Sequence, residues 1–140
     1  MAYAALVERT VALPKRKVYE RLADFGGVAK LLPAAIASVT HEGNGIGMIR
    51  KITLKDAPGE VWERLEALID QQFVSYSMLK AAALPLEHYH AVVELSDAAN
   101  GGCSIRWGSN WFAKGAPAAD VQAMLVGLYN GIIDGVVALG

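Results

Sequence analysis

Two charged residues, Arg50 and Glu63, have the side chains most able to anchor a ligand or move a proton, because each interrupts an apolar strand face. Residues 48–55 alternate with a period of two, which is typical of a half-buried strand. A turn at residues 56–59 predicts the cross-strand pairs Leu54 with Val61, Ile52 with Glu63 and Arg50 with Leu65. The two charges would then lie diagonally on adjacent strands, ~7–8 Å apart at the backbone and within reach of long side chains.

A charge on a buried sheet face must be paired or hydrated. One interpretation is an internal ion pair between Arg50 and Glu63, or an outward slip of one of the two. The other is a polar anchor inside a cavity, where it holds water or the polar end of a ligand. An ion pair that lines a hydrated cavity satisfies both interpretations, so both stay open.

The neighbouring positions on this face are apolar or aromatic. A two-residue turn at Asp70-Gln71 predicts the pairs Leu65 with Tyr76 and Glu63 with Met78. The two later strands each have one more apolar face, formed by Tyr89, Ala91, Val93 and Leu95 in the first and by Cys103, Ile105, Trp107, Ser109 and Trp111 in the second. The predicted interior therefore combines large apolar side chains with two charges.

Other reactive residue types lack the partners that their chemistry needs. His88 and His90 share a strand face, but both point outward if Tyr89 points inward, and no cysteine or carboxylate is placed to complete a metal site. Cys103 has no histidine on its face, so we interpret it as a small buried hydrophobe. The sequence contains no phosphate-binding loop, dinucleotide fingerprint or Ser/His/Asp set in a plausible context. We therefore expect neither a metal nor another cofactor.

The elements that would position these side chains follow a simple order. Residues 3–13 predict a strand, and Pro14 begins a short helix whose buried stripe contains Val18, Leu22 and Phe25. A further helical turn is expected at 28–32. Six strands follow, at 36–42, 48–55, 61–69, 73–79, 88–95 and 103–112, and a long helix begins at 117. Tight turns between consecutive strands, with the helices kept apart from them, predict an α+β fold in one domain over residues 1–140.

The last helix raises the question of a membrane, because residues 121–140 carry a single charge, Asp134. At 100° per residue one broad face collects Val121, Leu125, Leu128, Tyr129, Ile132, Val136 and Leu139. The opposite face collects Asp120, Asn130, Asp134 and the glycines Gly127, Gly131 and Gly135. This asymmetry indicates a helix with one face in the core. The glycines are interpreted as tolerated surface positions, and close approach of a second copy in a homodimer is the alternative.

Composition excludes several classes of protein. The 140 residues are 54% hydrophobic and 19% charged with a net charge of -1, which excludes a disordered chain and argues against a nucleic-acid binder. A single cysteine excludes a disulfide framework. The first residues have no basic region of the kind that opens a signal peptide, so we expect a cytoplasmic protein.

A series of short sequence words occurs in order along nearly the whole chain: Asp24-Phe25-Gly26-Gly27, Leu32-Pro33, Gly45-x-Gly47-x-x-Arg50, Glu63-Arg64-Leu65, Tyr76, Leu84-Pro85, Tyr89 and Trp107. Together they resemble the polyketide cyclase/dehydrase and lipid transport family of the START/Bet v 1-like (SRPBCC) superfamily. The resemblance implies a helix-grip fold, in which a curved seven-stranded antiparallel sheet grips a long C-terminal helix, with two short helices after the first strand. It also implies a cavity for a small hydrophobic molecule between sheet and helix.

Residues 58–89 are also similar to the plant abscisic-acid receptors. That similarity matches Glu63, Tyr76 and Tyr89 to positions that line the receptors' pocket, and residues 56–59 and 81–86 to their gating loops. The receptors' ligand-anchoring lysine has no counterpart in residues 34–39. Hormone sensing is therefore not carried over.

From the residues and the resemblance together we expect a soluble carrier or sensor of a small hydrophobic ligand, with no nucleic-acid or membrane partner. The alternative is a cyclase or dehydratase acting on a carbonyl substrate in the same cavity, with Glu63 or a tyrosine as acid/base and Arg50 stabilising an enolate. A third hypothesis is an interaction protein that uses the glycine face of the last helix. The expected cavity lining is Arg50, Ile52, Leu54, Val61, Glu63, Leu65, Tyr76, Met78, Tyr89, Trp107, Ser109, Trp111, Leu125, Tyr129 and Ile132.

Overall fold

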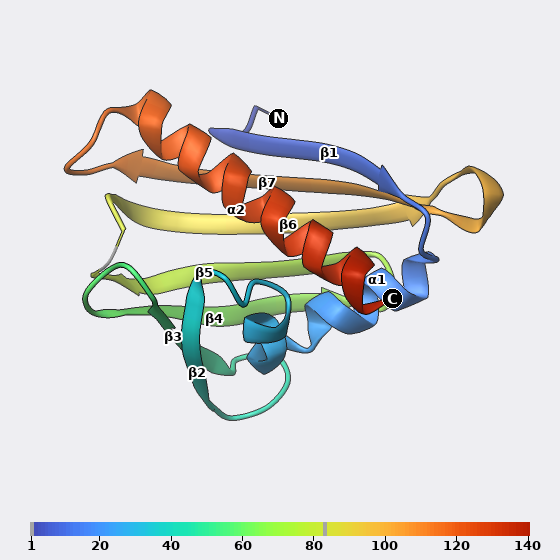
Figure 1. Ribbon diagram of the computed structural model, residues 1–140, viewed down its shortest axis with the longest axis horizontal. Helices are drawn as coiled ribbons and strands as arrows, with labels where there is room; N and C mark the ends of the chain where they lie inside the picture. Colours follow the sequence, from blue (N-terminus) through green and yellow to red (C-terminus); the bar gives the residue numbers. More distant parts are fainter. Residues whose placement is uncertain (1, 83) are drawn as a thin grey trace.

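Seven strands form one antiparallel sheet in the computed structural model, which describes residues 2–82 and 84–140 (Figure 1). The strands are β1 (Ala5–Val11), β2 (Ile36–Glu42), β3 (Ile49–Leu54), β4 (Glu60–Ile69), β5 (Phe73–Ala81), β6 (Leu86–Asp97) and β7 (Cys103–Ala113). Their order in the sheet is β1-β7-β6-β5-β4-β3-β2. Among the strands of the described residues, only β1 and β7 pair without being consecutive in sequence, as expected for a meander whose first strand returns to its last.

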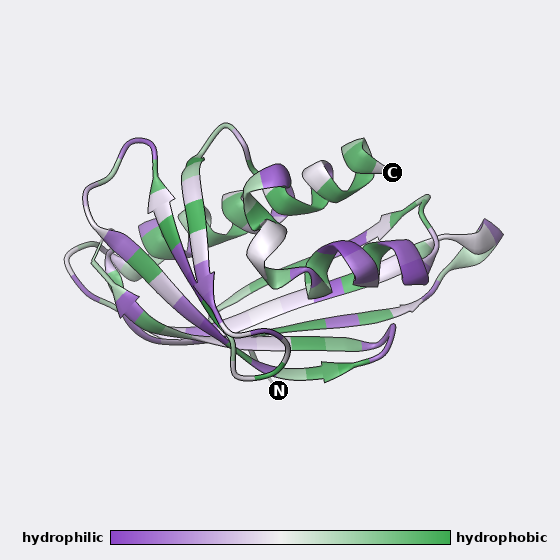
Figure 2. Cartoon of the chain, turned by 90° about the horizontal axis from the view of Figure 1, so that it is seen from below, coloured by the Kyte–Doolittle hydropathy of each residue, from purple (hydrophilic) through white to green (hydrophobic). Residues whose placement is uncertain are grey.

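The helical elements are α1 (Lys15–Ala23), η1 (Phe25–Lys30), the short η2 (Ala99–Gly101) and α2 (Ala118–Leu139). α2 crosses one face of the sheet diagonally in Figure 1, and the turned view of Figure 2 shows the sheet curving around it. α1 and η1 follow the first strand and cover the same side. The predicted α+β, helix-grip architecture is confirmed.

α2 turns one face toward the sheet and the opposite face toward solvent. Its buried residues are Val121, Leu125, Tyr129, Ile132, Ile133 and Val136. Leu139, expected on this face, is 42% exposed because the helix extends beyond the packed region. By length and apolar composition alone α2 could span a membrane, but the core helix of a soluble domain passes the same test.

The structure corrects the interpretation of two of the three helix glycines. A Cβ on Gly135 would overlap the carbonyl oxygen of Leu31, and a Cβ on Gly131 would lie 2.7 Å from Cδ1 of Leu32. These glycines allow α2 to approach the segment that follows η1 in the same chain. Gly127 has no described neighbour within 4 Å of such a Cβ, so surface tolerance explains that position.

The β3–β4 pairing differs from the prediction by two residues. Arg50 lies opposite Glu63 and Ile52 lies opposite Val61. The reason is a longer connection, which leaves residues 54–59 outside the ladder. A shift of two residues keeps every side chain on its predicted face, so the inward set is unchanged although the partners were wrong.

The β4–β5 pairing differs from the prediction in the length of its turn and in a register shift, and the two differences compensate each other. The predicted pairs Leu65 with Tyr76 and Glu63 with Met78 are confirmed. The predicted two-residue turn is wrong, because Ile69 pairs with Phe73 and residues 70–72 form the turn. A register shift between Leu65 and Ala67 absorbs the extra residue.

Candidate functional site

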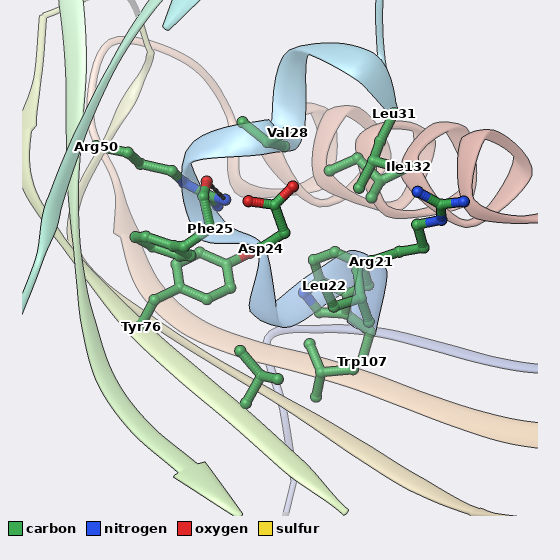
Figure 3. Close-up of a pocket in the computed structure, with 12 residues that line it drawn as sticks. Arg21, Leu22, Asp24, Phe25, Val28, Leu31, Arg50, Tyr76, Trp107 and Ile132 are labelled. Atoms are coloured by element: carbon green, nitrogen blue, oxygen red, sulfur yellow. Dashed lines mark hydrogen bonds between the residues drawn. The ribbon is translucent and has the colours of Figure 1, made fainter. Parts of the chain in front are cut away.

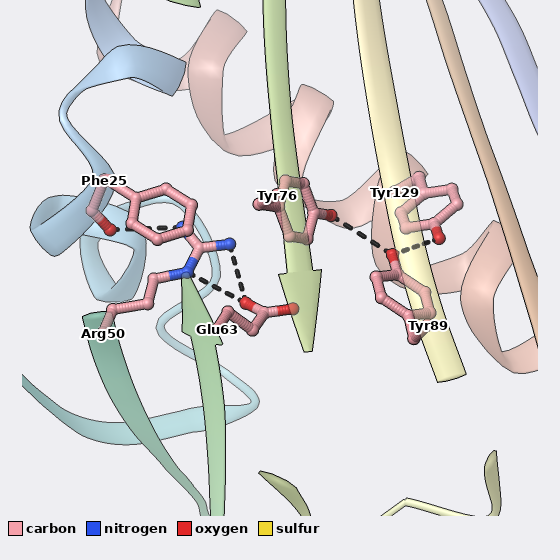
Figure 4. Close-up of polar contacts among 6 residues, drawn as sticks. All are labelled: Phe25, Arg50, Glu63, Tyr76, Tyr89 and Tyr129. Carbon is pink, nitrogen blue, oxygen red and sulfur yellow. Dashed lines mark hydrogen bonds and ion pairs between the residues drawn. The ribbon is translucent and has the colours of Figure 1, made fainter. Parts of the chain in front are cut away.

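Arg50 of β3 and Glu63 of β4 form an ion pair inside the molecule. Nε of Arg50 donates to Oε1 of Glu63 at 2.9 Å, and Nη2 lies 2.8 Å from the same oxygen. Each residue is only 6% exposed. The internal ion pair, one of the two interpretations that the sequence left open, is therefore formed. Figure 4 shows it beside three tyrosines.

The guanidinium group also joins the sheet to η1. Nη1 of Arg50 donates to the backbone carbonyl of Phe25 at 3.1 Å. Cζ of Arg50 lies 3.7 Å from the centroid of the Phe25 ring and 5.2 Å from that of Tyr76. Such cation–π contacts strengthen when water is excluded. Each nitrogen of Arg50 thus has a partner in the protein.

A chain of hydroxyl groups begins beside this pair and runs across the sheet to α2. Oη of Tyr76 lies 3.2 Å from Oη of Tyr89, and Tyr89 in turn hydrogen-bonds Tyr129. Tyr129 donates to Oγ of Ser109 at 2.7 Å. All four residues are buried. The chain joins β5, β6, β7 and α2 through side chains, and Figure 4 shows its three tyrosines.

Burial keeps these phenols neutral. It raises the pKa of Tyr76 and of Tyr89 well above the ordinary value of 10, and the nearby Glu63 carboxylate raises both further. Burial likewise raises the pKa of Tyr129. None of the three is a phenolate near neutral pH.

Between the sheet and α2 lies a cavity of about 70 Å³. Of the predicted lining it contains Arg50, Ile52, Leu54, Val61, Glu63, Tyr76, Met78, Tyr89, Leu125, Tyr129 and Ile132. It also contains Val28, Leu32, Ile36, Leu84 and Leu128, which the predicted lining did not include. Leu128 was already on the predicted core face of the helix. Val28 and Leu32 line the cavity because η1 lies over the sheet, and no pattern in the sequence predicts that position.

The other predicted lining residues lie elsewhere in the interior. Leu65 is fully buried in the core, and Ser109 is buried at the end of the hydroxyl chain. Trp107 stacks on Tyr129 with ring centroids 4.8 Å apart. Trp111, near the end of β7, is half-buried and does not line the cavity.

A second, smaller space of about 20 Å³ lies on the other side of Arg50, toward the end of α1 (Figure 3). Arg21, Asp24, Phe25 and Trp107 are among its lining. The volume suits a single water molecule, which needs about 10–15 Å³. Arg50, Tyr76, Val28 and Ile132 line both spaces and so divide them.

Half-buried leucines form the boundary of the larger cavity where the β3–β4 and β5–β6 loops lie. These are Leu54, at the end of β3, and Leu84, in the β5–β6 loop. The two loops touch, because a Cβ on Gly59 would lie only 2.9 Å from Cβ of Ala82. These loops are the two matched to gating loops by sequence; Ala83, in the second, lies outside the described residues.

Among the described residues, no group of three or more His, Cys, Asp and Glu side chains could hold a metal ion. His88 and His90 are exposed, as expected from the inward position of Tyr89. Cys103 is buried, and burial raises the pKa of its thiol. Neither feature contributes to the cavity.

The fold and the internal cavity define a Bet v 1-like protein. The model of the polyketide cyclase/dehydrase and lipid transport family matches residues 5–138. The chain belongs to this family. No curated protein sequence matches it significantly.

Solved structures share the fold over nearly their whole length. XoxI from Bacillus cereus is 18% identical with a TM-score of 0.83, and the match covers 99% of this chain and 95% of that one. Ara h 8.0201 is 25% identical with a TM-score of 0.77, covering 96% and 94%. A point mutant of norcoclaurine synthase from Thalictrum flavum, in complex with a transition-state analogue, is 18% identical with a TM-score of 0.76, covering 96% and 91%. At 18% identity the likeness concerns the fold alone.

Proposed function

We propose that this chain is a carrier or sensor that holds a small hydrophobic ligand in the cavity between the sheet and α2. The observation that carries the proposal is the distribution of polarity around that cavity. Its walls are mainly aliphatic, whereas Arg50 and Glu63 supply the only charges among the described residues that line it. Ligand sites typically combine apolar walls with a few placed polar groups, which fix the orientation of the ligand. Membership of a family described by lipid transport supports the same role.

Binding is favoured over the cyclase alternative by the state of two tyrosines and Arg50. Acid–base catalysis needs a group that exchanges a proton near the working pH and can reach the substrate. The raised pKa values of Tyr76 and Tyr89 hold those phenols neutral. Arg50 has protein partners at each nitrogen. The two phenols and Arg50 therefore support binding better than proton transfer.

The cavity volume limits the ligand. About 70 Å³ is several times the space that one water molecule needs, but less than the ~300–1,000 Å³ of drug-sized pockets. A ligand of few non-hydrogen atoms fits the structure as it stands. A larger one requires Leu54 and Leu84 to move outward, and both are half-buried at the loop end of the cavity.

Native mass spectrometry of the protein, after incubation with a lipid extract of the cells that produce it, tests the proposal. The wild type should carry a small apolar adduct. Val61→Phe should lose the adduct, because Val61 lines the cavity and is 3% exposed. Val92→Phe is the matched control on the opposite sheet face and should keep it. An adduct that survives Val61→Phe undiminished would show binding elsewhere and overturn the proposal.

A further inference from the structure

The carboxylate of Glu63 has one oxygen that the protein does not use. Both Arg50 contacts go to Oε1. Oε2 has no hydrogen-bond partner among the described residues, and it is not among the fully enclosed unpartnered atoms, which are the two tryptophan Nε1 atoms. Figure 4 shows Oε2 directed away from Arg50. A side chain that is only 8% exposed thus presents a charged acceptor to the cavity that it lines.

The hydroxyl chain beside it has a fixed direction, which follows from counting protons. Each hydroxyl group has one proton to donate. Tyr129 donates its proton to Ser109, so Tyr89 must donate to Tyr129. Tyr76 must then donate to Tyr89. The oxygen of Tyr76, the first in the chain, is left to accept a hydrogen bond from the cavity.

Arg50 directs three of its five N–H donors at acceptors of the protein. Its Nε and Nη2 face Glu63, and its Nη1 faces the carbonyl of Phe25. The Phe25 ring covers one face of the guanidinium group, with the Tyr76 ring further off. Oε2 of Glu63 and Oη of Tyr76 thus remain as two unused acceptors at the polar end of the cavity.

We propose that the ligand carries a neutral hydrogen-bond donor, a hydroxyl or amide N–H, which it directs at Oε2 of Glu63 and Oη of Tyr76. This inference rests on the proposed function and names the class of ligand for that same cavity. A neutral donor is favoured over an ammonium group because Arg50 already balances the charge of Glu63. A buried ammonium group would have no counter-charge of its own. A carbonyl or carboxylate would instead face Oε2 with a second acceptor.

A matched set of three compounds tests the proposal on the intact protein: cyclopentanol, cyclopentanone and cyclopentanecarboxylate. They share one ring and differ in the polar group. Their affinities are measured by titration with two-dimensional ¹H–¹⁵N NMR. Cyclopentanol should bind at least tenfold more tightly than the other two, because they leave buried acceptors unpaired.

Two variants test whether the preference for the alcohol over the ketone depends on Oε2 of Glu63 and Oη of Tyr76. Glu63→Gln introduces an amide donor and should reduce the alcohol-to-ketone ratio at least fivefold. Tyr76→Phe removes the second acceptor but retains the ion pair. It should lower the alcohol-to-ketone ratio by a smaller factor. This variant keeps the test available if Glu63→Gln folds poorly. Equal affinities in the wild type, or tighter binding of the ketone or carboxylate, would overturn this inference while the proposed function stands. Absence of binding by all three would overturn the proposed function with it.

Discussion

Arg50 and Glu63 face each other directly across β3 and β4, and the guanidinium group of Arg50 continues to the backbone and ring of Phe25. One cross-strand pair therefore fixes η1 over the sheet. Arg50 also lies between the ligand cavity and the smaller space near α1, because it lines both. The contribution of the ion pair to stability and its contribution to binding can be measured separately.

Removal of the charge on Glu63 should destabilise the fold. Glu63→Gln leaves a buried guanidinium group without its anion, and breaking a buried ion pair typically costs about 3–5 kcal/mol. We expect the free energy of unfolding to fall by about 3 kcal/mol in urea denaturation, because the amide oxygen still accepts one hydrogen bond. Glu66→Gln, which breaks the partly exposed pair with Arg64, is the control and should cost much less.

The double variant Arg50→Met/Glu63→Leu should recover much of that loss, because it removes both charges together. A Glu63→Gln protein as stable as the wild type would contradict the burial of this pair.

Gly135 and Gly127 should respond oppositely to the same substitution. Gly135→Ala places a methyl group into the carbonyl oxygen of Leu31, so it should lower the free energy of unfolding by about 1–3 kcal/mol, as overpacking does. Gly127→Ala meets open space and should stabilise by up to ~1 kcal/mol through helix propensity. Thermal and urea unfolding report both values. Equal effects of the two substitutions would contradict the close approach of α2 to Leu31.

Alkaline pH should unfold the protein through its buried tyrosines. The pKa of Tyr76 and of Tyr89 is raised in the folded state, so their contribution to stability is complete below the unfolded value of ~10. It is lost as the pH rises from there toward the folded values, because the unfolded chain releases protons that the folded one retains. Urea midpoints should hold up to about pH 10 and fall above it, and absorbance at 295 nm should rise together with the loss of structure. Ionisation of these phenols in a folded protein would contradict this account.

The hydroxyl group of Ser109 should contribute more to the free energy of unfolding than its size suggests. Ser109→Ala removes the acceptor at the end of the hydroxyl chain and leaves the Tyr129 proton unpaired in the interior, a change that typically costs about 1–3 kcal/mol. Ser104→Ala removes an exposed hydroxyl that pairs with Thr10 and should change stability far less. Urea denaturation compares the two variants. An equal loss of stability in both would show that the hydroxyl chain contributes little to the stability of the fold.

The strand faces could be predicted from sequence more securely than the strand partners. Arg50 and Glu63 were placed on the inward face because alternation alone determines it. Their direct opposition was missed, since the length of the β3–β4 connection is not visible in residue types. Only even shifts preserve the faces, and the actual shift was two residues.

Contacts between distant segments were beyond the sequence. Nothing in the words Asp24-Phe25-Gly26-Gly27 indicates that the Phe25 carbonyl accepts from Arg50, because that contact depends on where η1 comes to lie. The glycines of α2 carried a signal, small residues at helical spacing, but not the identity of the neighbour. Leu31 lies about a hundred positions earlier in the chain and meets Gly135 only after folding.

The most direct test of the central claim is to locate a bound ligand inside the protein. In methyl-labelled protein saturated with cyclopentanol, nuclear Overhauser effects from the ligand should reach methyl groups of Val61, Met78 and Leu125, which line the cavity. Contacts confined to exposed methyl groups, such as those of Ile46 and Leu79, would contradict an internal site.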